Sequence, residues 1–163
     1  MEEHRPGWDK VIRIGHIDDI EKIIEVGTKL LTRSKDRNVP IDRRSVFMVI
    51  RNFIQSADKA LLVAEHDDVF TGLIMASCEP FWWDNHRSGR RYVTDWAFYS
   101  ERPGDGLKML KIITEWAWSM PRVVKVAIAR NFDNAEDSAD RVFEAAGFER
   151  AGAMYTCFKP EVN

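Results

Sequence analysis

Two glycines, Gly104 and Gly106, stand between an aromatic-rich extended run and a helical pattern. The first amide N–H groups of a helix have no intrahelical partner, and the helix dipole places partial positive charge there. Because glycine has no side chain, the backbone at these two positions can approach an anion closely. The spacing therefore predicts a phosphate cradle, formed by the loop 101–106 and the start of the helix that follows.

Asp95 is the residue whose type and place suggest proton transfer. It lies within the extended run 92–99, whose other residues are mainly aromatic or apolar. A carboxylate in such surroundings tends to have a raised pKa and can act as a base near neutral pH. The simpler alternative is an ion pair with Arg90 or Arg91 that holds the preceding loop in place.

Metal chemistry and cysteine chemistry are not indicated. The four histidines show no ligand spacing, so we predict no metal site. Cys78 and Cys157 have no evident partner base, which is typical of buried, reduced thiols.

Hydrophobic periodicity predicts the elements that position these groups. Strands are expected at 11–14, 61–64, 69–77, 92–99, 123–129, 148–150 and 154–158, and helices at 16–32, 42–54, 107–120 and 139–146. Asp42 is expected to cap the second helix, and Gly147 to end the last one. The order β-α-α-β-β-β-α-β-α-β predicts an α/β (α+β) fold with a mixed, mostly antiparallel sheet flanked by helices.

The helices show apolar stripes that predict their buried faces. In the second helix these residues are Val46, Val49, Ile50, Phe53 and Ile54, and in the third Leu107, Leu110, Ile113, Thr114 and Ala117. In the last helix they are Ala139, Val142, Phe143 and Ala146.

Composition bounds the class of protein. The chain of 163 residues is 45% hydrophobic and 31% charged, which is typical of one ordinary soluble domain, 1–163. It shows no apolar run of membrane-spanning length and no secretory leader, so we expect a cytoplasmic protein that does not enter the membrane. A net charge of −2 argues against nucleic acid as a partner.

Residues 79–91 combine three adjacent aromatic residues with arginines and have no clean period, which indicates a loop between strands. Neighbouring residues of a strand face opposite ways, so we expect one of Trp82 and Trp83 to pack and the other to be available. The segment Phe81–Arg91 is therefore a candidate contact surface for a protein partner or a second copy of the chain.

Two motifs in this order of elements resemble the GNAT superfamily of N-acetyltransferases, and the resemblance covers residues 11–158. The family's pyrophosphate loop, Gln/Arg-x-x-Gly-x-Gly/Ala, is matched by Glu101–Gly106. The family's segment Ala-x-x-x-Tyr-x-x-x-Gly-Phe is matched by Ala139–Phe148, with Phe143 in place of the tyrosine.

The resemblance implies that acetyl-coenzyme A is the co-substrate and that the acceptor is a small-molecule or peptide amine. The pyrophosphate would be held by backbone amides of the loop, and the pantetheine arm would lie between the fourth and fifth strands. The implied loop residues are Arg102, Gly104, Asp105, Gly106 and Leu107, and the implied strand residues are Ala97, Phe98 and Tyr99.

This chain departs from the family pattern at Glu101, Asp105 and Phe143, and Glu136 stands where the family has an Asn ahead of the last helix. Glu101 and Asp105 put two carboxylates beside the pyrophosphate, although Asp105 has a second interpretation as a helix cap. Phe143 has no proton to donate. An active enzyme would then use Asp95 as base and Tyr155 as acid, or would release the thiolate directly to water. The simpler interpretation of Tyr155 is an ordinary half-buried strand tyrosine. The alternative is a GNAT-fold binding or structural module, of the kind found in some virus-encoded and assembly proteins.

Overall fold

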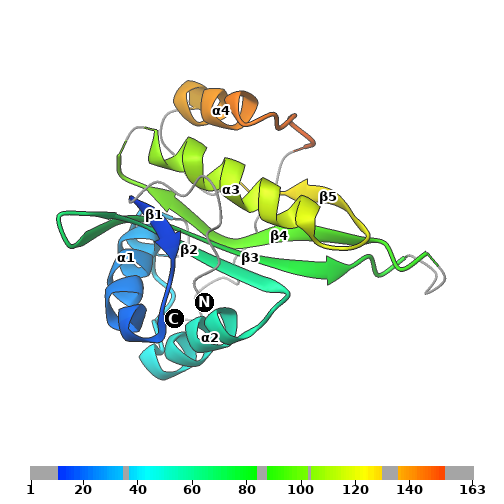
Figure 1. The fold of residues 1–163 in the computed structure, drawn as a ribbon. Coiled ribbons are helices and arrows are strands. Elements are labelled where there is room, and N and C mark those ends of the chain that lie inside the picture. The colour runs from blue at the N-terminus through cyan, green and yellow to red at the C-terminus, as the bar shows by residue number, and fades with distance from the viewer. Residues whose placement is uncertain (1–10, 35–36, 84–87, 103, 130–135, 153–163) are drawn as a thin grey trace, which may run out of the picture.

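The computed structural model describes residues 11–34, 37–83, 88–102, 104–129 and 136–152, with backbone alone for 136–139. In chain order the elements are β1 (Ile12–Ile14), the short 3-10 helix η1 (Ile17–Asp19), α1 (Ile20–Thr32), α2 (Arg43–Gln55), β2 (Lys59–His66), β3 (Val69–Pro80), β4 (Arg91–Ser100), α3 (Asp105–Ser119), β5 (Val123–Ala127) and α4 (Glu136–Ala145) (Figure 1). The predicted order is confirmed as far as α4.

The strands form one sheet in the order β1-β2-β3-β4-β5. The first four are antiparallel to their neighbours, and β5 runs parallel to β4 after the α3 crossover. The predicted hairpin of β2 and β3 is confirmed. It turns through Asp67 and Asp68, which have φ angles of 50° and 63°. Positive φ at both positions of a two-residue turn matches the twist of the flanking strands.

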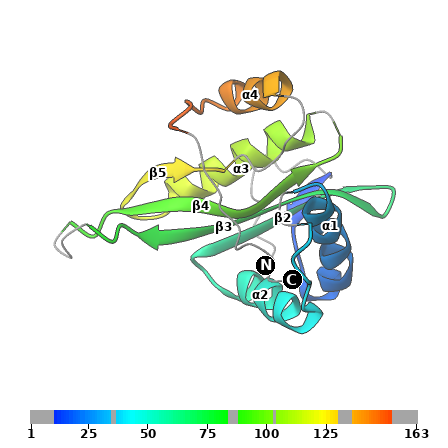
Figure 2. The same cartoon turned by 180° about the vertical axis from the view of Figure 1, so that it is seen from behind.

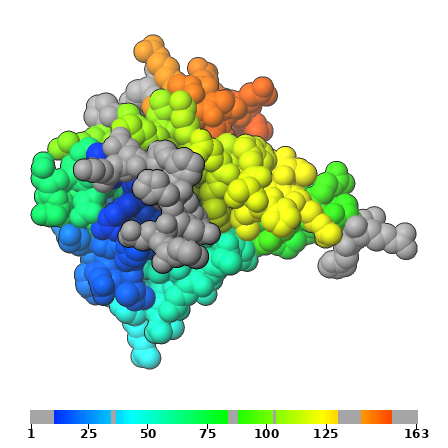
Figure 3. Space-filling view, viewed as in Figure 1, coloured from blue at the N-terminus to red at the C-terminus, as the bar shows by residue number. Residues whose placement is uncertain are grey.

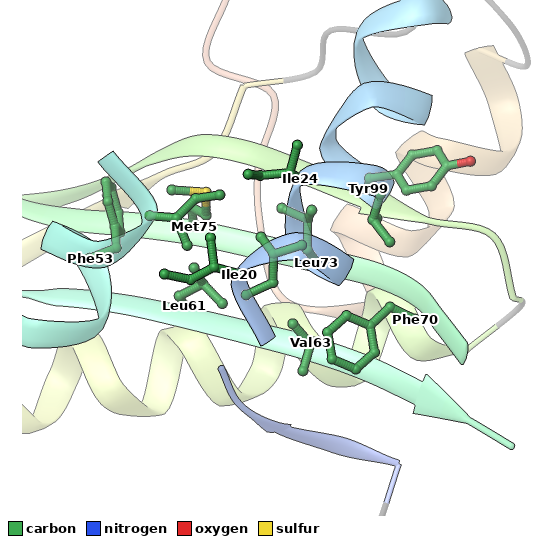
Figure 4. Packing of buried hydrophobic residues seen from close by; sticks show 12 residues of the cluster. Ile20, Ile24, Phe53, Leu61, Val63, Phe70, Leu73, Met75 and Tyr99 are labelled. Carbon is green, nitrogen blue, oxygen red and sulfur yellow. The ribbon is translucent and has the colours of Figure 1, made fainter. Parts of the chain in front are cut away.

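The helices cover both faces of the sheet: α1 and α2 lie on one face, α3 lies on the other, and α4 packs on the α3 side (Figures 1 and 2). Each face has its own hydrophobic core. In the core under α1 and α2, side chains such as Ile24, Leu73 and Met75 point toward one another (Figure 4).

Several predicted helix features are confirmed. The Asp42 side chain accepts a hydrogen bond from the Arg44 amide and so caps α2. On α3 the buried stripe holds Leu110, Ile113 and Ala117, as expected, together with Met109. Leu107 and Thr114, in contrast, are half-buried.

The C-terminal end of the described chain corrects one prediction. Residues 148–150 are not a strand. The amide of Phe148 donates to the Phe143 carbonyl at 3.0 Å, and Gly147 has a φ of +85°, so this stretch completes the helix-ending turn of α4. The predicted strand 154–158 lies outside the described residues.

The far ends of β3 and β4 project from the body of the molecule (Figures 1 and 3). The strands extend to Pro80 and Arg91, so they take residues that the sequence assigned to the loop. Trp82 and Trp83 are 86% and 65% exposed, so the expectation that one of them packs in the core is wrong. Both lie at a projecting tip, where no core is within reach.

Within the described residues, no helix is both long and apolar enough to span a membrane.

Candidate functional site

The site is built around the place where β4 and β5 separate. Their ladder runs from Arg91–Val123 to Thr94–Ala127 and ends there in the described chain, whereas β4 continues to Ser100. The backbone of β4 beyond Thr94 is therefore left without ladder partners from β5 among these residues. Such an edge can accept an extended ligand through main-chain hydrogen bonds.

A β-bulge in β4 marks the same place. Ala97 lies opposite Met75, and Asp95 lies opposite Ala76, so Trp96 is the extra residue. A bulge re-aims side chains locally. The Trp96 ring makes an edge contact with Phe53 at 5.3 Å between centroids, and its indole N–H donates to Ser77 Oγ at 2.8 Å. The ring is thus fixed beside α2 although it is 57% exposed.

Asp95 sits at the fork itself. Its Oδ1 accepts a hydrogen bond from the Ala129 amide at 2.7 Å. This side-chain bond links the two segments just beyond the last ladder pair, Thr94–Ala127. Burial raises the pKa of this carboxyl, and the hydrogen bond from Ala129 offsets part of the rise.

The alternative ion pair between Asp95 and an arginine is wrong. Arg91 donates to the Cys78 carbonyl at 2.6 Å and lies 3.7 Å from Asp58, and Arg90 bonds Ser88. Asp95 instead accepts from the amide of Ala129, two residues beyond the end of β5.

The start of α3 is where the sequence predicts a phosphate cradle. The N-cap is Gly104, with a φ of +89°, and it has no side chain to accept from the first amide groups of the helix. A Cβ added at Gly106 would lie 3.4 Å from the Phe98 ring and 3.5 Å from Ser100 Cβ. The helix start therefore packs directly against the open stretch of β4.

Asp105 does not cap α3, so the interpretation of this residue as a helix cap is wrong. It is the first helical residue, its side chain is 6% exposed, and its Oδ2 lies 2.7 Å from His66 Nε2. His66 Nδ1 in turn lies 3.0 Å from Arg102 Nη1. A guanidinium can only donate, so His66 Nδ1 is the acceptor of that bond. His66 Nε2 then carries the hydrogen and donates it in a hydrogen bond to Asp105 Oδ2.

Glu101 also points away from the cradle. Its Oε1 accepts from the Tyr99 hydroxyl at 2.8 Å and lies 3.6 Å from Lys29 Nζ on α1. Burial, followed by the neighbouring Glu101 carboxylate, raises the pKa of Tyr99 to about 12. Both acidic side chains of the loop therefore have partners in other parts of the chain.

The remaining site predictions have mixed outcomes. Phe143 packs edge-on against Phe98 and Phe148, with ring centroids 5.9 Å apart in each pair, and brings no proton donor to the fork. Tyr155 lies outside the described residues. The described part of the chain also shows no group of His, Cys, Asp and Glu that could hold a metal ion.

A cavity of about 590 Å³ opens between α1, α2 and the bulged part of β4. It reaches Phe98 and Ala129, which flank the fork. A cleft of this size is typical of small-molecule sites.

Two parts of the site, His66 and Trp96, were missed as functional candidates from the sequence. His66 is 39 residues from Asp105 in the chain. Its position at the end of a strand before a two-residue turn was the available signal, because strand ends often line sites. For Trp96 there was no signal, since a bulge follows from the register of two strands.

Comparison with protein-family models and with curated protein sequences gives no match. Solved structures, however, are similar in fold. A predicted acetyltransferase of Clostridium acetobutylicum, solved with acetyl-CoA, matches with a TM-score of 0.67 and 14% identity over 90% of this chain and 94% of that one.

Two further structures are similar to the chain. Glucosamine-6-phosphate N-acetyltransferase of Arabidopsis thaliana matches with a TM-score of 0.66 and 14% identity over 90% of this chain and 96% of that one. The aminoglycoside 6′-N-acetyltransferase of Acinetobacter baumannii matches with a TM-score of 0.64 and 16% identity over 93% and 98%. The chain therefore has the GNAT fold, as predicted.

Proposed function

We propose that this protein is an N-acetyltransferase that moves an acetyl group from acetyl-CoA to a primary amine. One observation carries the proposal: β4 and β5 separate between the start of α3, which opens with a glycine, and a half-buried carboxylate, Asp95. An anion cradle and a candidate base then lie along the same open strand. The fold alone would not decide function.

The residues present fit coenzyme A. The pyrophosphate would be held by amides of the segment at the start of α3, and the pantetheine arm by the open edge of β4. The side chains of Asp105 and Glu101 already have partners, so Asp105 offers its amide rather than its charge. The proposed contacts are Arg102, Gly104, Asp105, Gly106 and Leu107 in the cradle and Ala97, Phe98 and Tyr99 on the strand.

The proposed reaction is direct transfer. The amine nitrogen forms a bond to the thioester carbonyl carbon, the carbon–sulfur bond breaks, and the thiol and the N-acetyl amine are the products. Asp95 accepts the proton lost by the amine, and its raised pKa makes it a stronger base than an exposed aspartate. Tyr155 is proposed to donate a proton to the leaving sulfur, because Phe143 has none to give.

The test is a calorimetric titration with acetyl-CoA, followed by an acetylation assay with a panel of amines. Gly106→Val adds an isopropyl group where the helix start meets β4, so it should abolish binding while circular dichroism stays unchanged. Lys111→Val is the matched control, because it puts the same side chain at an exposed position of the same helix. If a folded Gly106→Val variant binds acetyl-CoA as tightly as the parent, the cradle is misplaced.

A second candidate function is a binding module, and the exposed aromatic tip favours it. Trp82 and Trp83 stand edge to face at 5.2 Å, and Phe81 contacts Trp83 and Tyr92. Such a patch on an exposed tip is typical of protein contacts. The segment Phe81–Arg91 would then take a protein partner or a second copy. A change of solution mass in the double variant Trp82→Ser, Trp83→Ser, measured by light scattering, would support self-association.

A further inference from the structure

The cavity under α1 and α2 has a mostly apolar wall. Aliphatic side chains from α1, α2 and β3 line most of it, and Trp96 closes the end nearest the fork. In its described lining there is no lysine, arginine, histidine or glutamate, and Asp42 is the one carboxylate. That carboxylate stands at the exposed start of α2 and caps it, accepting from the Arg44 amide and from Ser45 Oγ.

The hydroxyl groups of the lining donate to the chain itself. Thr28 Oγ1 donates to the Ile24 carbonyl at 2.8 Å, and Ser34 Oγ donates to the Leu31 carbonyl at 2.9 Å. Ser45 Oγ donates to Asp42 at 2.5 Å. The protons of these hydroxyls are therefore used within their own helices and turns, so a polar occupant that needs hydrogen-bond donors would lose its bonds to water without replacing them.

A glycine in the middle of α1 contributes to the space. Gly27 lines the cavity, and a Cβ added there would meet no atom within 4 Å. Glycine in a helix interior is less favourable than alanine. At this position the absent side chain leaves room beside the bulge of β4.

We infer that the acceptor is a small monoamine with an apolar body, such as an arylalkyl or alkyl primary amine. This inference rests on the proposed acetyl transfer. The apolar body fills the cavity against Trp96, and the amino group points to the fork, where Asp95 holds the Ala129 amide. Amines with several charges or many hydroxyls are rejected, since the one carboxylate of the described lining, Asp42, already caps α2 and the hydroxyl protons are in use.

The experiment compares two sets of amines with the full-length protein and acetyl-CoA. 2-Phenylethylamine and hexylamine represent the apolar class, and spermidine, kanamycin and glucosamine 6-phosphate represent the polar class. We expect kcat/KM to be at least about 100-fold higher for the apolar class. A polar amine acetylated as efficiently as 2-phenylethylamine would overturn the inference.

A cavity-filling variant gives the second readout. Gly27→Leu places four carbons in the open space, so the KM for 2-phenylethylamine should rise at least about 10-fold while the Kd of acetyl-CoA is unchanged. Glu25→Leu adds the same side chain at an exposed position of α1 outside the lining and should change neither value. An unchanged KM in Gly27→Leu would show that the amine binds elsewhere.

Direct binding separates this inference from the proposed function. 2-Phenylethylamine is titrated by calorimetry in two experiments. One contains CoA, which has no acetyl group to transfer, and the other contains the protein without any co-substrate. If acetyl-CoA fails to bind, the proposed function fails, and binding of 2-phenylethylamine that Gly27→Leu removes still supports the cavity as its site. If acetyl-CoA binds but 2-phenylethylamine does not, the inference fails and the proposed function stands.

Discussion

The two faces of the sheet are packed very differently. On the α3 face, a Cβ added at Gly72 would lie 2.9 Å from the Tyr99 carbonyl oxygen and 3.0 Å from Met109 Cε. On the α1 face, a Cβ added at Gly27 would meet nothing within 4 Å, and a cavity of about 590 Å³ lies beside it. The sheet is thus closely packed around Gly72 on the α3 side and open around Gly27 on the α1 side.

The contrast follows from how the helices lie on the sheet. The stripe of α3 holds Met109, Leu110 and Ile113, each 0% exposed, so this helix lies flat on the strands. On α2, Ile50 is buried but Val49 is 39% exposed and borders the cavity. The close packing around Gly72 helps to fix the strands, and the cavity beside α1 can then accept a ligand without loss of the sheet.

The largest expected effect is at the fork between the two faces. Asp95→Asn keeps an oxygen for the Ala129 amide but cannot accept a proton, so we expect kcat to fall by about 10²- to 10⁴-fold with the Kd of acetyl-CoA unchanged. Steady-state kinetics and calorimetry on the same preparation check this. If the Asp95→Asn variant kept its activity, the Asp95 carboxylate would not be the base.

The same variant also has a pH-dependent effect on stability. The folded-state pKa of Asp95 is raised, so the folded protein binds this proton more tightly than the unfolded chain does. The parent therefore loses stability as pH rises from the ordinary aspartate pKa through the raised one. Asp95→Asn lacks this loss, and its stability relative to the parent should increase over that window. Urea melts on both sides of the window measure the difference.

The next effect contrasts the two faces in their response to truncation. Met109→Ala removes a fully buried side chain from the packed face and should lower the free energy of unfolding by about 2–5 kcal/mol. Val49→Ala trims the rim of the cavity and should cost less than about 1 kcal/mol. Denaturant unfolding of both variants checks this, and equal losses would mean that the cavity side is as well packed as the α3 side.

The sequence was informative where local chemistry decides structure. Asp42 caps α2 because its carboxylate reaches the Arg44 amide two residues on, and the hairpin turn of β2 and β3 is equally local. The element order also followed from periodicity and from the glycines at 104 and 106. These features depend on neighbours within a few positions, which are visible in the sequence.

The site depended on contacts that the sequence does not show. The carboxylate of Asp105 contacts His66, which is 39 residues away in the chain. The carboxylate of Asp95 accepts from the backbone amide of Ala129 and does not pair with an arginine close by in the chain. The bulge that turns Trp96 toward α2 comes from one register shift between β3 and β4. The cavity likewise depends on where the helices lie on the sheet. The sequence therefore did not show which apolar residues would line it together.

A smaller effect tests the closeness of packing on the α3 face. Gly72→Ala forces a methyl group against the Tyr99 carbonyl oxygen, which is backbone and cannot move aside cheaply. Overpacking of this kind typically costs about 1–3 kcal/mol. Thermal unfolding should show a lower Tm, and a second variant, Gly72→Ala with Met109→Leu, shows whether the Met109 side chain shares in the clash. A neutral Gly72→Ala would contradict the close packing of this face.

The smallest expected effect has the opposite sign and completes the comparison. In Gly27→Ala the new methyl group enters open space, and alanine restricts the unfolded chain and favours the helix, so the free energy of unfolding should rise by about 0.4–1 kcal/mol. Thermal and urea unfolding measure this gain, with Gly72→Ala as the matched substitution on the other face. The added methyl is small against the cavity, so acetyl-CoA binding should not change. A loss of stability in Gly27→Ala would mean that the space beside α1 is filled in solution, and the difference between the two faces would then disappear.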